Sequence, residues 1–296
     1  MGTVFLSTAQ VYNNSCEIEA GLAYEMHKLC YSRIANPSNY FLEETAALLE
    51  TYDSDIEASC VATASGMAVI RTATDPFLIK DNSLPAPNIV SCAKVYGGTF
   101  QQFWVQRSEE QGIEVRWIKN PFDLKEWESK SDKGTRFLYG KFPSNPSVTI
   151  FDIEMIAEVA HSRNIPLIVD STSASPAFTR LLEFGADIVI QSATKVMGAS
   201  GTSIAGLLIA KKNIASKVGT DEMRGGFATW AKFWHYRDNE FLLSPMSAIL
   251  LLNDIRSLRM RIAQISISAL KESNIRAISS RTWNRLWIKL NESEND

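Results

Sequence analysis

Apolar and polar positions along the chain form blocks of two kinds. Short apolar runs, typical of buried strands, lie at 59–65, 88–94, 113–119, 135–142, 165–170, 186–192 and 203–210. Longer segments with apolar residues on one helical face lie at 40–52, 66–77, 97–112 and 152–164. Strands that alternate with helices indicate βαβ units. We therefore predict an α/β fold, with a mostly parallel sheet and helices on both faces.

The two ends of the chain depart from this alternation. Residues 1–40 contain Asn, Ser and Pro clusters without a steady period, which predicts an irregular arm. Residues 244–270 predict one long helix, buried along Ile249, Leu252, Ile255 and Leu258. We divide the chain into an N-terminal arm (1–40), a central domain (41–240) and a connecting helix with an atypical tail (241–296).

Charge and cysteine content exclude several classes of protein. The net charge of −3 over 296 residues gives no reason to expect nucleic-acid or membrane-surface partners. The sequence contains no run of about 18 apolar residues, so we predict no membrane span. Its start lacks the basic segment of a secretory signal. The four cysteines, Cys16, Cys30, Cys60 and Cys92, lack metal-site spacing. We expect reduced thiols, no metal and a cytoplasmic protein.

Two charged residues follow the ends of predicted strands. Asp170 ends the strand 165–170, and Lys195 comes just after the strand 186–192. Neighbouring parallel strands would bring both side chains to one edge of the sheet, where such folds bind ligands. An acid and a lysine together suit pyridoxal phosphate. The lysine forms a Schiff base with the aldehyde, and the carboxylate keeps the pyridine nitrogen protonated.

Hydroxyl and small residues near these two predict a phosphate site. Hydroxyls flank Lys195, and residues 65–67 follow a strand and open a helix whose N–H groups can bind an anion. The candidate phosphate ligands are Ser65, Gly66, Met67, Ser192 and Thr194. Each feature alone has a simpler explanation, as a helix cap, a turn or a solvated surface charge. Their occurrence together favours the cofactor.

Six motifs strengthen this interpretation. The segments "YSRIANPS", "ASGMA", "VYGGTF", "PSNP", "VDSTSASP" and "GADIVIQSATK" occur in this order. Their order resembles that in the Cys/Met-metabolism family of pyridoxal-phosphate enzymes, over roughly residues 30–260. This family includes cystathionine synthases and lyases, methionine γ-lyases and O-acetylhomoserine sulfhydrylases. The resemblance implies a fold-type-I pyridoxal-phosphate enzyme with pyridoxal 5'-phosphate as cofactor, bound by the central domain.

The resemblance also implies roles for single residues within one subunit. Lys195 would bind the cofactor covalently and then move protons, and Asp170 would pair with the pyridinium nitrogen. Tyr96 would stack on the cofactor ring, although a core tyrosine is the alternative. Asn145 would lie near the phenolic oxygen of the cofactor, although a plain Asn-Pro turn is a fair rival.

Two further residues are implied to act across a subunit interface. Tyr31 and Arg33 are similar to residues that reach the phosphate of the neighbouring subunit. The N-terminal arm would then contact that subunit, in a homodimer or a dimer of dimers (a homotetramer) with shared active sites. Tyr96 or the neighbour's Tyr31 would assist proton transfer to the leaving group.

The chain differs from the family pattern at several positions. Ser171 stands where the family usually has Asn, and Lys141 where it usually has Glu. Ala199 and Ser200 replace a common Gly-His pair, and "GTSIAG" is closer to the sulfhydrylase branch. The family also has a C-terminal domain with an arginine for the substrate carboxylate. The tail from about residue 271 does not resemble it, so we hypothesise a truncated product.

The resemblance implies β- or γ-elimination or replacement on sulfur amino acids or O-acylhomoserine, within transsulfuration. The substrate would be a small amino acid. The alternative is a truncated, non-catalytic remnant that binds cofactor at most. A third possibility, another pyridoxal enzyme of the same fold such as an aminotransferase, is disfavoured by "YSR" together with "SATK".

Overall fold

A single seven-stranded sheet forms the centre of the protein. The structure is a computed structural model that describes residues 3–22, 31–239 and 241–273. The strands follow the order β1-β7-β6-β5-β4-β2-β3 across the sheet. Their bounds are β1 Ala58–Thr63, β2 Asn88–Cys92, β3 Glu114–Ile118, β4 Thr135–Lys141, β5 Leu167–Asp170, β6 Ile188–Gln191 and β7 Gly206–Lys211. The pairs β1–β7 and β7–β6 are antiparallel and the other four pairs are parallel, so the predicted mostly parallel sheet is confirmed.

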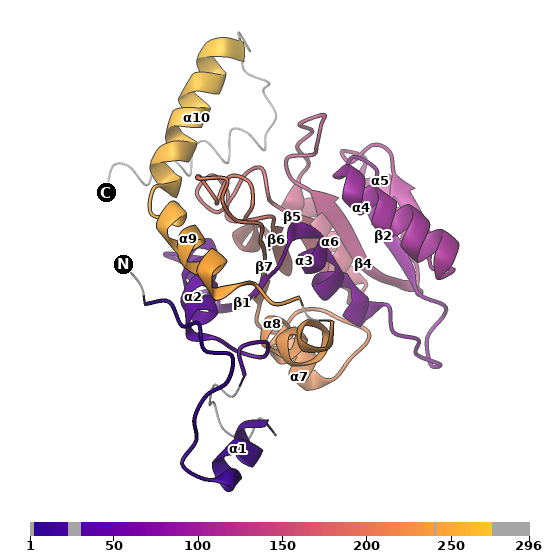
Figure 1. The fold of residues 1–296 in the computed structure, drawn as a ribbon. Coiled ribbons are helices and arrows are strands. Elements are labelled where there is room, and N and C mark those ends of the chain that lie inside the picture. The colour runs from indigo at the N-terminus through magenta and orange to yellow at the C-terminus, as the bar shows by residue number, and fades with distance from the viewer. Residues whose placement is uncertain (1–2, 23–30, 240, 274–296) are drawn as a thin grey trace.

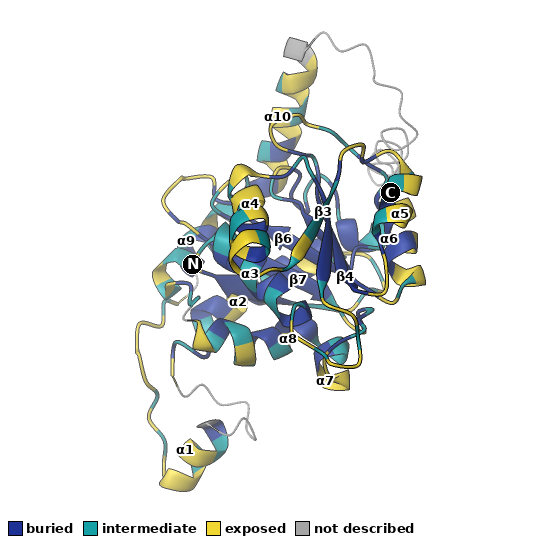
Figure 2. Ribbon diagram, turned by 90° about the vertical axis from the view of Figure 1, so that its right-hand side faces the viewer, coloured by how far each residue is buried: buried dark blue, intermediate teal, exposed yellow. Residues whose placement is uncertain are grey.

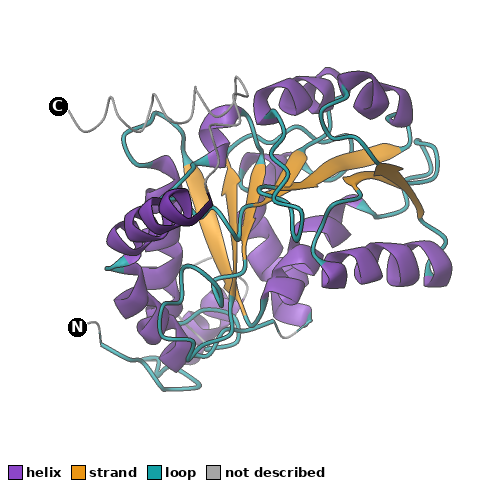
Figure 3. Cartoon of the chain, turned by 90° about the horizontal axis from the view of Figure 1, so that it is seen from above, coloured by secondary structure: helices purple, strands orange, loops and turns teal. Residues whose placement is uncertain are grey.

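Helices cover both faces of this sheet, as Figure 3 shows from above. The α-helices are α1 Ser15–Leu22, α2 Pro37–Thr51, α3 Gly66–Thr74, α4 Gly97–Gln101, α5 Leu124–Lys130, α6 Ile153–Ser162, α7 Asp221–Gly225, α8 Phe227–Ala231, α9 Pro245–Ile255 and α10 Leu258–Ser273. Short 3-10 turns lie at η1 Asp75–Phe77 and η3 Leu181–Phe184, and π-helical segments at η2 Gln102–Glu110 and η4 Lys232–Tyr236. The pattern analysis did not predict α1, α5, α7 or α8. Because α1 lies within residues 3–22, this described part of the N-terminal arm is less irregular than expected.

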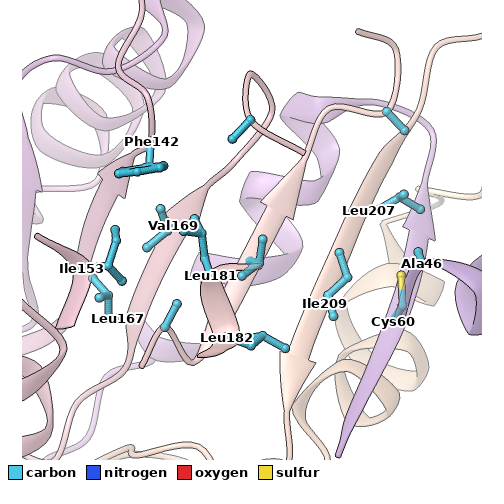
Figure 4. Packing of buried hydrophobic residues seen from close by; sticks show 14 of the residues in the cluster. Ala46, Cys60, Phe142, Ile153, Leu167, Val169, Leu181, Leu182, Leu207 and Ile209 are labelled. Carbon is cyan, nitrogen blue, oxygen red and sulfur yellow. The ribbon is translucent and has the colours of Figure 1, made fainter. Parts of the chain in front are cut away.

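Successive residues of a strand point to opposite faces of the sheet and pack into two separate hydrophobic cores. Leu167 and Val169 of β5 pack with α2, α6 and α9, whereas Ile168 between them packs with α3, η2 and α8. Figure 4 shows the first of these cores, which runs from Phe142 beyond β4 to Ala46 on α2. Figure 2 shows most strands as buried, the edge strand β3 as partly exposed, and the outer faces of the helices as exposed. Burial on both faces explains why the strands are continuous apolar runs.

The C-terminal helical segment is broken, contrary to the prediction of one helix over 244–270. Helix α9 ends at Ile255 and α10 begins at Leu258. At the break, the Ser257 hydroxyl donates to the Asp254 carbonyl oxygen at 3.0 Å and accepts from Arg261 Nε at 3.0 Å. Serine side chains that bond to nearby backbone groups compete with the helix in this way. Figure 1 shows α10 leading away from the sheet.

The predicted buried face of this segment is confirmed. Ile249, Ile255 and Leu258 are buried, and Leu252 packs against the same core. The part of the predicted tail from 274 to 296 lies outside the described residues. Within the described ranges, none of the helices combines the length and the apolar character that crossing a bilayer would require.

Candidate active site

Asp170 lies at the carboxyl end of β5 and forms a buried ion pair with Lys141 at the end of β4. The two residues are direct neighbours in the parallel register. Lys141 Nζ lies 3.0 Å from Asp170 Oδ2, and the two side chains are 3% and 7% exposed. Asp170 Oδ1 accepts from the Thr172 N–H at 2.9 Å and from the Thr172 hydroxyl at 2.5 Å. The carboxylate is therefore held in one orientation by three donors.

Thr172 connects this acid to the loop after β6. Its hydroxyl oxygen donates to Asp170 and accepts from the Ser192 N–H at 2.8 Å. The Lys195 N–H in turn donates to the Ser192 carbonyl oxygen at 3.1 Å. A short chain of hydrogen bonds thus places the turn that carries Lys195 next to Asp170, as the sequence predicts.

Lys195 itself is exposed in this turn. Within the part of the chain that the structure describes, its ammonium group forms no hydrogen bond or ion pair. The two lysines at this edge of the sheet therefore differ in burial and pairing. Lys141 is buried and paired with Asp170, whereas Lys195 is exposed and unpaired among the described residues. A lysine that reacts with a carbonyl must be accessible, and the exposed side chain of Lys195 meets this requirement.

The predicted phosphate residues on α3 approach the same loop. The Ser65 hydroxyl oxygen caps α3 by accepting from the Ala68 N–H at 3.1 Å. A Cβ atom on Gly66 would lie only 2.8 Å from Cβ and Oγ of Ser192. The absence of a side chain at Gly66 therefore lets the helix N-terminus approach the Ser192 hydroxyl. A helix N-terminus beside a hydroxyl is a suitable site for a phosphate group.

Thr194 differs from the other predicted phosphate ligands. Its hydroxyl donates to the Ala205 carbonyl oxygen at 3.2 Å and accepts from the Ala205 N–H at 3.0 Å. Both hydrogen bonds close the loop between β6 and β7. The hydroxyl is thus committed to the backbone in this structure.

Tyr96 lies at the start of α4 with 48% of its surface exposed, so the alternative of a core tyrosine is wrong. A Cβ atom on Gly98 would lie 2.6 Å from the Tyr96 ring and 3.0 Å from Met67 Sδ. Tyr96 and Met67 are therefore close together near the start of α3. Asn145 is exposed in the turn after β4, and this turn begins where the Phe142 N–H donates to the Asp170 carbonyl oxygen at 2.9 Å.

Tyr31 and Arg33 belong to a different cluster within this chain. Arg33 Nη1 donates to the Arg237 carbonyl oxygen at 3.2 Å, and its guanidinium carbon lies 5.4 Å from the centre of the Tyr31 ring. Tyr31 also forms a β-bridge with Ala9. Among the described residues, no hydrogen bond or ion pair joins this cluster to Asp170 or Lys195.

Sequence reasoning missed three residues of the site. It noted Lys141 as a departure from the family pattern without pairing it to Asp170, and it gave Thr172 no role. The available signal was that Asp170 ends one predicted strand and Lys141 is the last residue but one of the predicted strand before it. The third is Tyr139, which is fully buried on β4. Burial first, and then the charge of Asp170, raises the pKa of the Tyr139 phenol well above its usual value, so this side chain stays neutral.

The residues present fit pyridoxal phosphate in donor chemistry. A buried acid, an exposed lysine and a helix N-terminus beside a hydroxyl lie at one edge of the sheet. The sequence model of the Cys/Met metabolism PLP-dependent enzymes matches residues 2–275. The chain belongs to this family. The predicted fold and, at the level of the family, the predicted cofactor are thereby confirmed.

Individual members of the family are identical to the chain at about a third of the aligned positions. It is 34% identical over 206 residues to the O-acetyl-L-homoserine sulfhydrylase of Corynebacterium glutamicum, covering 70% of this chain and 45% of that protein. It is 30% identical over 292 residues to the homocysteine/cysteine synthase of Saccharomyces cerevisiae, covering 90% and 62%. The chain thus spans about half the length of these curated relatives.

A solved structure resembles the whole described architecture. It is a Campylobacter jejuni protein provisionally described as an O-acetylhomoserine (thiol)-lyase, with N'-pyridoxyl-lysine-5'-monophosphate in its chain. The TM-score is 0.79 at 27% sequence identity, and the match covers 91% of this chain and 69% of that protein. The likeness of fold therefore extends beyond the residues around the site.

Proposed function

We propose that the chain binds pyridoxal phosphate and takes part in β- or γ-elimination or replacement on sulfur amino acids or O-acylhomoserine. The observation that carries this proposal is the exposed, unpaired Lys195 at the same edge of the sheet as the buried Asp170. The hydrogen bonds through Thr172 and Ser192 hold the two loops together. Membership of the family supports the same conclusion.

The proposed contacts to the cofactor come from five places in the fold. The phosphate would be held by Ser65, Gly66, Met67 and Ser192. Asp170 would face the ring nitrogen, Tyr96 would stack on the ring, and Asn145 would lie near the phenolic oxygen. Thr194 would have to release Ala205 before its hydroxyl could join the phosphate ligands.

The chemistry divides between the cofactor and the protein. Bound pyridoxal phosphate supplies an aldehyde that condenses with amines and a ring that accepts electron density from the substrate. Lys195 Nζ would hold the cofactor and later take the proton from the substrate Cα. The Tyr96 hydroxyl, or that of Tyr31 from a second copy of the chain, would give a proton to the leaving group.

The proposed assembly is a homodimer or a dimer of dimers. Tyr31 is 42% exposed and, with Arg33, lies in the cluster with Arg237 rather than with Asp170 of its own chain. Both would serve the site of a neighbouring subunit. We also propose a cytoplasmic location, which the free thiols of Cys16, Cys60 and Cys92 support.

The names of the two relatives described above favour replacement at O-acylhomoserine, because they describe a sulfhydrylase and a synthase. Elimination on methionine or cystathionine is the alternative outcome. An assay of the purified chain with O-acetylhomoserine and sulfide, set beside assays with methionine and cystathionine, distinguishes these reactions.

Cofactor binding is tested by adding pyridoxal phosphate to the purified chain. The protein should turn yellow, and borohydride should fix the cofactor on the peptide that contains Lys195, as read by mass spectrometry. Lys195→Ala should lose both signals, whereas Lys125→Ala, which removes another exposed lysine, should keep them. A chain that takes up no cofactor contradicts the proposal. A yellow chain that converts none of the substrates supports the non-catalytic alternative.

A further inference from the structure

The ion pair between Lys141 and Asp170 puts a positive charge where the cofactor itself would bring one. Lys141 Nζ lies 3.0 Å from Asp170 Oδ2, and both side chains are almost completely buried. Asp170 is the only described partner of this ammonium group. Water screens such a pair little, so each group strongly affects any further charge placed beside it.

The acceptor capacity of Asp170 is nearly used. An ionised carboxylate offers about four lone-pair sites. Three donors already bind it, namely Lys141 Nζ and the N–H and hydroxyl of Thr172. One more donor can be accommodated, but it would share the carboxylate with an ammonium group.

Among the residues that the structure describes, no acid other than Asp170 pairs with Lys141. Tyr139 is the other titratable group whose interaction with Asp170 is evident, and burial raises the pKa of its phenol, so it remains neutral. The pair is therefore close to neutral as a unit. A protonated ring nitrogen would add a second cation to it, whereas a neutral ring nitrogen would not.

We propose that Lys141 is a positioning residue that neutralises Asp170, so that this chain binds pyridoxal phosphate with an unprotonated ring nitrogen. The inference rests on the proposed function, because it concerns the same cofactor. It predicts a weaker electron sink than a lone carboxylate would produce, and hence less stabilisation of negative charge at the substrate Cα.

The test compares two ligands on the same protein. One is pyridoxal phosphate, and the other is its analogue in which C–H replaces the ring nitrogen. Wild-type chain should bind both with dissociation constants within about threefold, since Asp170 gains little from the nitrogen. In Lys141→Gln the acid loses its cation, so pyridoxal phosphate should be preferred by about tenfold or more, the factor that corresponds to one pKa unit.

A matched control comes from a second buried ion pair. Lys232 Nζ lies 2.6 Å from Glu43 Oε2, with both side chains 5% exposed. Lys232→Gln breaks this pair and should leave the ligand preference as in the wild type. Because each preference is a ratio within one protein, loss of part of the sample to misfolding does not alter it.

A second measurement needs no variant. The nitrogen-15 NMR shift of labelled cofactor on the wild-type chain should be that of a neutral pyridine. A pyridinium shift, or an unchanged ligand preference in Lys141→Gln, would overturn the inference while leaving the proposed function intact. If neither ligand binds to the wild type or to either variant, the proposed function fails and this inference fails with it.

Discussion

The two ends of the central sheet each hold a buried aspartate, but the two acids have different surroundings. At the carboxyl end, Asp170 is paired with Lys141, whose side chain is 3% exposed. At the amino end, Asp187 contacts Lys211 Nζ at 2.9 Å, His161 Nε2 at 2.8 Å and the Leu167 N–H at 2.8 Å. Lys211 and His161 are 23% and 37% exposed, so solvent still reaches these partners.

This difference indicates that Asp187 stabilises the fold, whereas Asp170 is placed to contact a bound cofactor. Asp187 joins three elements: it accepts a hydrogen bond from a backbone N–H of β5 and contacts side chains of β7 and α6. Asp170 contacts Lys141 on the neighbouring strand β4 and Thr172 in the loop after its own strand, β5. Thr172 in turn is hydrogen-bonded to the loop that carries Lys195. Changes at the amino end should therefore alter stability, and changes at the carboxyl end should alter cofactor binding and activity.

The largest expected effect is the loss of activity in Lys195→Ala. Removing the group that we propose to move the substrate proton should lower kcat by about 10²–10⁴-fold. The free energy of unfolding without cofactor should stay within about 0.5 kcal/mol of wild type, because the side chain is exposed and unpaired. Steady-state kinetics and urea unfolding measure the two quantities, with Lys125→Ala as control. A large loss of stability would contradict the comparison.

Next in size is the effect of Asp187→Ala on stability. Breaking this buried network should lower the free energy of unfolding by about 3–5 kcal/mol. The affinity of the remaining folded protein for pyridoxal phosphate should not change. Asp221→Ala, which removes a fully exposed carboxylate at the start of α7, should change stability by less than about 1 kcal/mol. Equal effects of the two substitutions would show that Asp187 does not hold the sheet.

Glu50 predicts a pH dependence at the amino end. Its Oε1 accepts from the N–H groups of Leu181 and Leu182, just before β6. Burial raises the pKa of Glu50 from 4.5 to about 8. Because the folded pKa lies above the unfolded one, the unfolded chain loses this proton first as the pH rises. Stability from this group is therefore complete below pH 4.5 and is lost between there and about pH 8.

Glu50→Gln removes the loss of stability with rising pH, because glutamine does not ionise. Its amide oxygen can still accept hydrogen bonds from Leu181 and Leu182. The variant should match wild type at low pH and exceed its free energy of unfolding by about 3 kcal/mol at pH 7. Urea unfolding between pH 4 and pH 8 follows the divergence. Glu158→Gln, at an exposed position on α6, should run parallel to wild type. Parallel curves for Glu50→Gln as well would refute the prediction.

The smallest expected effect concerns Thr172. Thr172→Val leaves the Ser192 N–H without its acceptor and Asp170 without one donor, which should cost about 1–2 kcal/mol of stability. Cofactor affinity should fall together with it, whereas Thr172→Ser should restore both. Isothermal titration and urea unfolding on the three proteins give the comparison. If Val and Ser behave alike, the hydroxyl does not orient the site.

Local patterns were sufficient for much of the fold. All seven strands and the helices α2, α3 and α6 follow from apolar periodicity, because burial against a sheet selects residue type at regular spacing. Short polar helices such as α5 and α7 have too few residues to show a period, so they were missed. The break at Ser257 was missed because it depends on hydrogen bonds from one side chain.

The sequence by itself determined the βαβ architecture and the family, and it supplied the proposal that Lys195 binds the cofactor, since each depends on residues close together in the chain or on the order of motifs. Only the tertiary structure decided that Lys141 pairs with Asp170, that Thr172 links two loops, and that the Thr194 hydroxyl is bound to Ala205. These contacts join residues from different strands and loops. Their distances depend on strand register and loop closure, which the whole packed core establishes.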